Sequence, residues 1–436
     1  MLARAIALHR SGKLREAEPL YAAVLAAEPD HPDALHFLGV LRHAQGASDE
    51  AAALIRRSLA LAPGNPDAQN NLGNVLLETG QSAEAIAAYR RVVELRPDAA
   101  EAHHNLGVAL RALGQVAAAE AAIEHAIALD PRQAVFHYSL AMLWLRSGRP
   151  QNAIPILQVV LALDPNFSPA HVAHIRAIRL SGAAPAAALA ALDAWLEREP
   201  DNAVARHMRA AYSGEAVPAR ASDGYVRSLF VNYAATFDAH LDRLGYRAPQ
   251  LLHTAIAGVL GEPRRLLDVL DAGCGTGLCG PLLRPFARRL AGVDLVEAMV
   301  AKARERDNYD ELTVGELTAF LAARSQAYDL IVSADTLVYF GDLSAVASAA
   351  SGALHPGGVL AFSLERRDTE DLARGYRLEE HGRYSHTADY VRCVVEEAGL
   401  AILTLEHAVP RNEGGAPVAG LVVVARKPAD AAHSKA

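Results

Sequence analysis

The sequence contains few cysteines and few aromatic residues. Its 436 residues include three cysteines, Cys274, Cys279 and Cys393, and aromatic residues make up 6% of the chain. An odd and sparse set of cysteines argues against a disulfide framework and favours a reducing compartment. Because no cysteines and histidines have the spacing of zinc ligands, we expect no metal site.

Long apolar segments and an excess of basic charge are also absent from the sequence. No apolar run approaches the roughly 20 residues that cross a bilayer, so we expect no membrane segment. Charged residues interrupt residues 1–13, where a signal peptide needs an apolar stretch, and this favours a cytoplasmic protein. The formal net charge of −8 gives no indication of the basic surface that binds nucleic acid.

The first half of the chain repeats with a period of 34 residues. Glycines recur with this spacing, an alanine follows each glycine by five residues, and prolines close the units. The glycines are Gly12, Gly46, Gly80, Gly114, Gly148 and Gly182. Each unit predicts two amphipathic helices, with the glycine at the turn between them and the proline at the end of the second helix. We expect six units over residues 1–212, followed by a linker at residues 213–224.

The repeat resembles the tetratricopeptide (TPR) repeat. Residues 71–73 and 105–107 both read Asn-Leu-Gly and match its first helix. The resemblance implies an all-α solenoid that binds a protein or peptide on its concave face. Asn71 and Asn105 occupy equivalent positions in neighbouring units, where asparagines of some TPR proteins hold an extended peptide. Asparagine is also simply common at this point of the repeat, so both interpretations of the pair remain open.

The second half, residues 225–436, is organised around an apolar strand, a glycine-rich loop and a helix. Residues 266–270 form the apolar run, and Asp271 follows it. Three glycines then alternate with other residues: Gly273, Gly275 and Gly277. A dinucleotide site would require a glycine at Leu278, and the carboxylate of Asp271 would repel a pyrophosphate. An acid at this point suits a cationic ligand such as S-adenosylmethionine (SAM), which carries an ammonium and a sulfonium group.

The pattern Asp-x-Gly-x-Gly-x-Gly resembles motif I of the class I SAM-dependent methyltransferases. The predicted second strand ends in Asp294, and an acid at this point suits the two hydroxyl groups of a ribose. In the family, the end of the fourth strand, here residues 327–333, leads into a loop that faces cofactor and substrate. The resemblance therefore implies a cofactor site composed of Asp271, Ala272, Gly273, Cys274, Gly275, Gly277, Asp294, Leu295, Glu316, Leu317, Ala334 and Asp335.

Several of these assignments have alternatives. Glu316 could hold the adenine amino group or be an acid of a surface loop. Tyr233 and Phe237 lie in a predicted helix, residues 225–243, that resembles the family's cofactor lid, although a plain core stripe would look the same. Cys274 could be a nucleophile, but a small residue between two loop glycines is the simpler interpretation.

The resemblance also implies the architecture of the second domain. It predicts an α/β Rossmann-like domain, with a mixed sheet of seven strands in the order 3-2-1-4-5-7-6. The last two strands are predicted at residues 400–406 and 421–425. A closing hairpin with one antiparallel strand distinguishes this family from dinucleotide-binding folds.

Methyl transfer is an in-line displacement in which the cofactor supplies the electrophile and the protein supplies alignment. A catalytic base, where one is needed, would lie at the strand ends of the sheet. The candidates are Asp335, Tyr339, Glu365 and His386. A histidine has the most suitable pKa, but His386 could instead cap the helix that follows it.

The two halves together resemble a bacterial family of predicted methyltransferases with N-terminal TPR repeats. This resemblance implies SAM-dependent methyl transfer to an unidentified acceptor, with the array recruiting a protein partner or substrate. Two alternatives remain: a small-molecule O- or N-methyltransferase, and a TPR scaffold whose methyltransferase fold is inactive. The spacing of the glycines and Asp271 argue against an NAD-dependent oxidoreductase.

Overall fold

The computed structural model describes residues 1–231, 233–234, 236–368 and 374–429. The chain divides into two compact units, Met1–Ala191 and Leu192–Ala436, and each is described by itself. Within the described ranges, no helix has the length and apolar character needed to cross a membrane.

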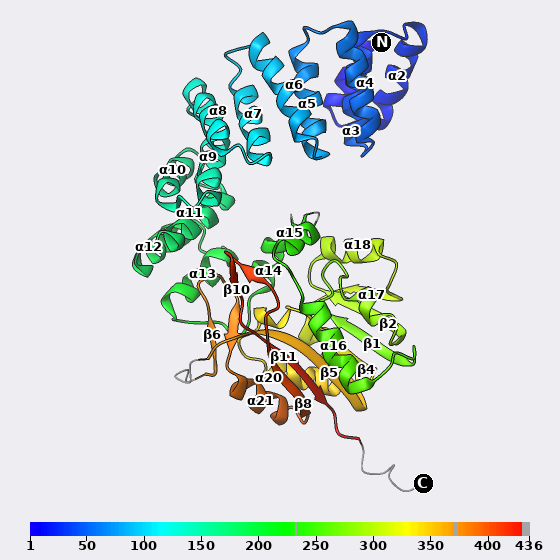
Figure 1. The fold of residues 1–436 in the computed structure, drawn as a ribbon, viewed down its shortest axis with the longest axis vertical. Helices are drawn as coiled ribbons and strands as arrows, with labels where there is room; N and C mark the ends of the chain where they lie inside the picture. Colours follow the sequence, from blue (N-terminus) through cyan, green and yellow to red (C-terminus); the bar gives the residue numbers. More distant parts are fainter. Residues whose placement is uncertain (232, 235, 369–373, 430–436) are drawn as a thin grey trace. The chain divides into compact units, whose positions relative to one another are not determined.

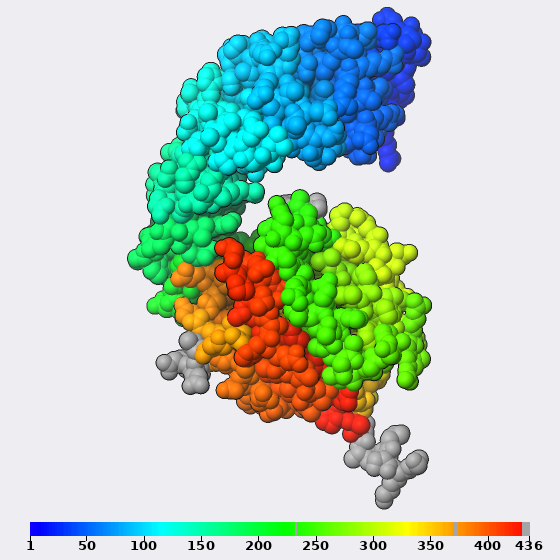
Figure 2. Space-filling model, in the orientation of Figure 1, coloured from blue at the N-terminus to red at the C-terminus, as the bar shows by residue number. Residues whose placement is uncertain are grey.

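The first unit consists of helices joined in pairs, and Figures 1 and 2 show successive pairs stacked into a continuous surface. The helices are α1 (Leu2–Arg10), α2 (Leu14–Ala27), α3 (Pro32–Ala44), α4 (Ser48–Leu61), α5 (Pro66–Glu78), α6 (Ser82–Leu95), α7 (Ala100–Ala112), α8 (Val116–Leu129), α9 (Ala134–Arg146), α10 (Pro150–Leu163), α11 (Ser168–Leu180) and α12 (Pro185–Arg198), the last of which continues into the second unit. This pattern confirms the predicted all-α array.

The repeated glycines and alanines have the structural roles that their spacing predicts. All six turn glycines have positive φ, for example 85° at Gly46, a conformation that residues with a Cβ rarely adopt. In the first five units the alanine that follows the turn glycine by five residues, such as Ala85, is fully buried where two helices cross. In the sixth unit Ala187 is exposed and Ala188 is the buried residue. Three units have a second glycine, Gly39, Gly73 or Gly107, that permits close packing; a Cβ on Gly73, for example, would lie 2.6 Å from the ring of Tyr89.

The second unit begins before the position that the repeat pattern suggests. Helix α13 (Ala203–Ser213) falls within residues predicted for the array, yet Ala210 and Ala211 pack with Leu378 and Tyr384 of the second unit. In addition, His207 Nε2 donates a hydrogen bond to the carbonyl oxygen of Gly382 at 2.8 Å. Helix α13 therefore belongs to the second unit, which begins at Leu192, within α12.

The predicted linker lies against the second unit as well. The amide of Ala221 donates to the carbonyl oxygen of Tyr339 at 2.8 Å, and Ala219 accepts from the amide of Gly341. The segment then continues into α14 (Asp223–Phe230), α15 (Phe237–Arg243) and α16 (Ala248–Leu260). The prediction of one helix over residues 225–243 was wrong, since α14 ends at Phe230; Ala235, within the predicted helix, lies outside the described residues.

A mixed sheet forms the centre of the second unit. Its strands are β1 (Leu267–Ala272), β2 (Ala287–Asp294), β3 (Glu311–Val314), β4 (Tyr328–Ser333), β5 (Leu354–Arg366), β8 (Ala401–Ala408) and β11 (Gly420–Arg426). Their order is β3-β2-β1-β4-β5-β11-β8, and β11 pairs antiparallel with both β5 and β8. This confirms the predicted order 3-2-1-4-5-7-6. Two short strands extend the sheet beside β5, and a separate short hairpin follows β8: β6 (Tyr376–Leu378), β7 (Tyr384–His386), β9 (Asn412–Glu413) and β10 (Ala416–Pro417).

Alternate residues of the strands enter two cores, one on each face of the sheet. On one face, Leu270 and Ile331 pack with side chains of the helices α19 (Leu317–Ala322), α20 (Ser344–Ala353) and α21 (Ala388–Glu397). On the other face, Val269 and Leu330 pack against α16 and α17 (Gly280–Leu283). Figure 1 shows these helices around the sheet. Because both faces are covered, the strand ends are left to form a site.

Candidate functional site

A cavity of about 390 Å³ lies at the carboxyl ends of β1, β2 and β4. In an open α/β sheet, this is where the strand order reverses and where ligands bind. The residues that sequence analysis predicts for the cofactor site and that line the cavity are Gly273, Cys274, Gly275, Asp294, Leu295, Glu316, Leu317, Ala334 and Asp335. Three others, Asp271, Ala272 and Gly277, are not among the lining residues, so the structure brings together nine of the twelve predicted positions.

The three loop glycines have different roles. Gly273 has φ 83°, and a Cβ there would lie 2.1 Å from Thr336 Oγ1, so this loop touches the end of β4. Gly275 has φ 53° and open space beside it, which lets a ligand approach the backbone. Gly277 has φ 87° and packs against Tyr309, which explains why it faces away from the cavity.

Asp294 ties the loop to the second strand. Its Oδ2 accepts a hydrogen bond from the amide of Gly275 at 2.9 Å, and its Oδ1 accepts one from the amide of Val296 at 2.9 Å. Burial raises the pKa of this carboxyl group above its usual value, although the backbone hydrogen bonds act in the opposite direction. The side chain thus faces the cavity and at the same time fixes the loop.

Asp271 lies beneath the loop and is fully buried, contrary to the expectation that it faces a ligand directly. Its Oδ2 accepts a hydrogen bond from the hydroxyl group of Tyr309 at 2.6 Å. Burial raises the pKa of Asp271 to about 7, the Tyr309 bond lowers it, and the charge of Asp294 raises it. Its Oδ1 is buried without a hydrogen-bond partner among the described residues.

Cys274 is buried between the loop glycines. Burial raises the pKa of its thiol well above the usual value, and the charges of Asp271 and Asp294 act in the same direction. The thiolate form that a nucleophile requires is therefore disfavoured. The geometry favours the simpler interpretation, in which Cys274 is a small structural residue of the loop.

Glu316 is the N-cap of α19. Its Oε1 and Oε2 accept hydrogen bonds from the amides of Thr318 and Ala319 at 3.0 and 2.8 Å. The side chain also lines the cavity, beside the apolar side chains of Leu295 and Leu317. Glu316 is thus held by its own helix at the cavity wall, and its capping role explains why an acid is found here.

Aromatic side chains of α14, α15 and the turn between them cover part of the cavity. Phe237 contacts both Phe230 and Tyr233 edge-to-face, with ring centroids 5.9 and 5.6 Å apart. Phe230 in turn contacts Tyr339, which follows β4, at 5.9 Å. All four rings line the cavity. Tyr233 and Phe237 therefore line the cavity, as residues of a cofactor lid would. They also pack against each other, as residues of an apolar core would.

Sequence analysis missed a group of charged residues at one end of the cavity. Arg411 donates through Nε to Glu413 Oε1 at 2.8 Å and also bonds Asp335 and Glu365. Arg383 donates through Nε to Glu365 Oε1 at 2.5 Å and through Nη2 to Glu413 Oε1 at 2.6 Å. We call these five residues the charge cluster. Two arginines therefore pair with three carboxylates. Four of the five side chains, all except Glu365, line the cavity.

The charge cluster fixes the position of Asp335. This residue has φ 51°, which is uncommon outside glycine and is tolerated by aspartate. The hydroxyl group of Ser363 accepts from the amide of Asp335 at 2.9 Å and donates to its Oδ1 at 3.2 Å. Burial raises the pKa of Asp335, while Arg411 lowers it. Burial raises the pKa of Glu413, but the charges and hydrogen bonds of Arg383 and Arg411 outweigh it and lower the pKa to about 2.

The four candidate bases lie in different environments. Asp335 and Tyr339 line the cavity, and burial raises the pKa of Tyr339 to about 12. Glu365 is buried within the charge cluster and is not among the lining residues.

His386 does not face the cavity, contrary to expectation, because it is fully buried and its Nε2 donates to the carbonyl oxygen of Gly341 at 3.1 Å. Burial lowers its pKa to about 4. The alternative role, helix capping, falls to the next residue, since the side chain of Thr387 accepts from the amide of Tyr390.

The two asparagines singled out in the array contact the preceding repeat. Asn71 Nδ2 donates to His36 Nε2 at 2.8 Å, and Asn105 Nδ2 donates to Asn70 Oδ1 at 3.0 Å. Both side chains therefore link neighbouring units through their amide groups. For metals, no group of His, Cys, Asp or Glu within the described ranges has an arrangement that could hold an ion.

Comparison with known sequences finds family matches within both parts of the chain. The methyltransferase-domain family matches residues 241–405. Families of tetratricopeptide repeats match residues 2–66, 54–87, 73–114 and 104–166. The chain combines TPR repeats with a methyltransferase domain. The resemblance noted from the sequence is therefore confirmed for both domains.

Individual relatives match the methyltransferase domain over part of their length. A malonyl-[acyl-carrier protein] O-methyltransferase of Acetivibrio thermocellus is 37% identical over 104 residues, which cover 23% of this chain and 37% of that protein. A probable SAM-dependent methyltransferase of Mycolicibacterium smegmatis is 32% identical over 136 residues, or 31% and 52% of the two chains. The chain thus spans about half the length, or less, of these curated relatives.

Among solved structures, a SAM-dependent methyltransferase from Mesorhizobium loti has 25% sequence identity to this chain and a TM-score of 0.32. The match covers 40% of this chain and 96% of that chain.

Proposed function

We propose that this protein is a SAM-dependent methyltransferase whose TPR array recruits a protein partner or substrate. The observation that carries the proposal is the joint placement of the glycine loop and Asp294 at one cavity, where the carboxylate holds the amide of Gly275. The methyltransferase-domain match and the sheet order support it. The SAM-dependent relatives support the choice of cofactor.

The residues of the cavity fit SAM in charge and shape. The open space beside Gly275 admits the ligand to the backbone, and Asp294 offers carboxylate oxygens to the ribose hydroxyl groups. Leu295 and Leu317 provide apolar contacts for the adenine ring. The Oδ1 of Asp271, which has no hydrogen-bond partner among the described residues, lies beneath the loop, and a cationic ligand would favour the ionised form of this carboxyl group. When bound, SAM supplies an electrophilic methyl group.

The charge cluster marks the end of the cavity where we place the acceptor. Arg411 and Ser363 orient the carboxylate of Asp335, and its raised pKa makes it a better proton acceptor than an ordinary aspartate. Asp335 is therefore our candidate for positioning the acceptor or accepting its proton. His386 has no part in this proposal, because it is buried away from the cavity.

A small-molecule acceptor is the alternative, and the names of several relatives, malonyl-[acyl-carrier protein] O-methyltransferases, include a carboxylic acid. In this chain the two arginines at the acceptor end are already paired with Asp335, Glu365 and Glu413. Three carboxylates against two guanidinium groups disfavour a further carboxylate. This charge balance makes a neutral or cationic acceptor group the better fit.

Calorimetric titration of the full chain with SAM, S-adenosylhomocysteine and NADH tests the proposal. We expect binding of the first two with Kd near or below micromolar, about −8 kcal/mol, and none of NADH. Binding of NADH alone would contradict the cofactor assignment. If none of the three binds, the protein is instead a TPR scaffold with an inactive methyltransferase fold.

A further inference from the structure

Four arginines on the first helices of three successive repeats have no acidic partner among the residues that the structure describes. They are Arg111 in α7, Arg146 in α9, and Arg176 and Arg179 in α11. Within the described part of the chain, the side chains of these four make no salt bridge and no hydrogen bond. Some other arginines of the array, such as Arg42 and Arg149, are paired with glutamates. We call the four unpaired residues the arginine face.

The arginines of this face are close enough to act on one another. Burial lowers the pKa of Arg111, and the charge of Arg146 lowers it further. Burial also lowers the pKa of Arg176, with Arg179 and Arg146 acting in the same direction. A positive charge that is partly desolvated and surrounded by like charges is costly to the free protein. A bound anion would relieve that cost.

The sequence of these helices leaves the positive charge uncompensated. Helices α9 and α11 contain no acidic residue, and the single acid of α7, Glu101, lies in its first turn, far from Arg111 in the last. Of the two acids of the following helix, α8, Glu120 is already engaged, because it pairs with Arg149 and accepts from Trp144. The arginine face is therefore positive although the whole chain carries −8.

The face is continuous from one repeat to the next. Helix α7 contacts α9 and α9 contacts α11, and Figure 1 shows these helices following one another along the array. Exposed apolar side chains lie on the same helices: Val135 is 45% exposed and Val172 is 46% exposed. Val172 precedes Arg176 by four residues and so shares its side of α11. The surface thus offers both cationic and apolar contacts.

We propose that the arginine face binds an acidic segment of a partner protein, whose carboxylates pair with Arg111, Arg146 and Arg176 and whose apolar side chains contact Val135 and Val172. This inference rests on the proposed recruiting role of the array and specifies the chemistry of the partner. Guanidinium groups suit carboxylates because their planar donors can bind both oxygens. A nucleic acid fits less well, since a long polyanion would be repelled by the acidic remainder of the chain.

Fluorescence anisotropy with labelled peptides tests this binding on the full chain. The probe is a fluorescein-labelled peptide rich in glutamate and leucine, and its counterpart has glutamine in place of every glutamate. We expect the acidic peptide to bind, the glutamine peptide to bind at least about tenfold more weakly, and the affinity of the acidic peptide to fall as salt is added. Equal binding of the two peptides, or binding of neither, overturns the proposal.

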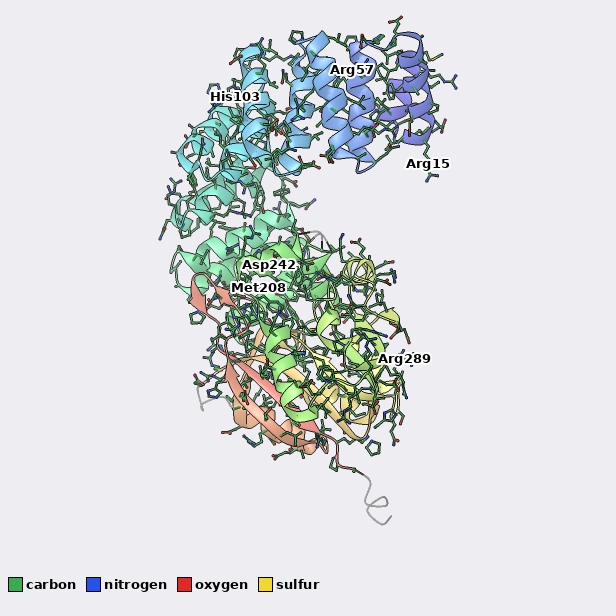
Figure 3. The ribbon with its side chains drawn as sticks, turned by 45° about the vertical axis from the view of Figure 1, so that its right-hand side comes forward. Arg15, Arg57, His103, Met208, Asp242 and Arg289 are labelled. Carbon is green, nitrogen blue, oxygen red and sulfur yellow. The ribbon has the colours of Figure 1, made fainter. Side chains whose placement is uncertain are left out.

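Substitution of the arginines locates the site. The triple variant Arg111→Gln, Arg146→Gln, Arg176→Gln should lose about tenfold or more in affinity for the acidic peptide, the scale of three partly exposed ion pairs. The matched control is Arg15→Gln, Arg90→Gln, Arg132→Gln, which removes the same charge at exposed residues outside this face; Arg15 projects from α2 in Figure 3. An equal loss in the control overturns the proposal.

Two further measurements separate the possible reasons for failure. A labelled single-stranded oligonucleotide that binds more tightly than the acidic peptide, through the same three arginines, would replace the acidic segment as the ligand. Titration of the triple variant with SAM should give the affinity of the unmodified chain, because none of the three arginines lines the cavity. Normal SAM binding without peptide binding rejects the arginine face and leaves the methyltransferase proposal standing.

Discussion

Asp294 accepts a hydrogen bond from the amide of Gly275 at 2.9 Å, so the acid that ends the second strand also holds the loop that follows the first. The two residues are 19 positions apart; Asp294 ends β2, and Gly275 lies in the loop that follows the neighbouring parallel strand β1. One carboxylate therefore shapes the backbone of the site and presents charge to the cavity. Loss of this side chain should affect the ligand more than the fold.

Asp294→Ala should weaken SAM binding by roughly 1.5–3 kcal/mol, the scale of a lost hydrogen bond to a charged group. Isothermal titration of the full chain measures this change. The control is Asp242→Ala, the same substitution at an exposed acid of the same unit that Figure 3 labels. If Asp294→Ala leaves the affinity unchanged, Asp294 does not belong to the cofactor site.

Gly273→Ala should distort the loop, because a Cβ at φ 83° would lie 2.1 Å from Thr336 Oγ1. We expect a cost of more than about 1 kcal/mol in stability together with weaker SAM binding. Thermal unfolding and calorimetric titration report the two effects. Gly352→Ala is the matched control, since this helical glycine has no atom within 4 Å of the added carbon. It should leave SAM affinity unchanged and raise stability slightly.

The array could be predicted in detail because its signals are local. Gly46 and Gly80 mark turns that need positive φ, and the spacing of 34 residues repeats the same signal six times. The strand order could be predicted because the glycine loop and Asp294 resemble the motifs of class I methyltransferases, and that family has a known order of strands. Such features depend on residues that are near one another in the sequence or that form a known pattern.

The charge cluster could not be predicted, because its members meet only after folding. Arg411 is 76 residues from Asp335 and 46 from Glu365, and no spacing along the chain relates them. His386 illustrates the opposite error: a histidine near a strand end looked accessible, but the aromatic ring of Tyr390 stacks against it and its burial is complete. Burial and long-range pairing are tertiary properties that a local pattern does not specify.

The raised pKa of Asp271 should make the methyltransferase unit less stable as pH rises. The pKa is about 7 in the folded protein against 3.8 for the ordinary side chain. Between these values the folded state binds more protons than the unfolded state, so the free energy of unfolding falls with increasing pH. Calorimetric melting between about pH 4 and pH 8 measures this trend. Asp271→Asn, which keeps an acceptor for Tyr309, should reduce the slope; an unchanged slope would exclude Asp271 as its source.

Arg411→Met should destabilise the methyltransferase unit by about 3–5 kcal/mol, because it leaves the buried carboxylates of Asp335 and Glu365 without their shared partner. Denaturant unfolding of the full chain measures the loss. Arg209→Met is the matched control, since its partner Asp193 is exposed, and it should cost less than about 1 kcal/mol. Similar losses in the two variants would show that the charge cluster is no more than a surface ion-pair network.

Two truncations test where the methyltransferase unit begins. A chain of residues 185–436 keeps α12 and α13, whereas a chain of residues 213–436 loses them and exposes the apolar surface around Leu378 and Tyr384. The shorter chain, residues 213–436, also lacks His207. The Nε2 of His207 donates a hydrogen bond to the carbonyl oxygen of Gly382, which is next to Arg383 of the charge cluster. We therefore expect residues 185–436 to melt as the intact unit does and to retain SAM affinity, and residues 213–436 to melt at a lower temperature. Equal melting of the two chains would mean that α13 contributes no stability and that the boundary suggested by the repeat pattern, at residue 212, is the correct one.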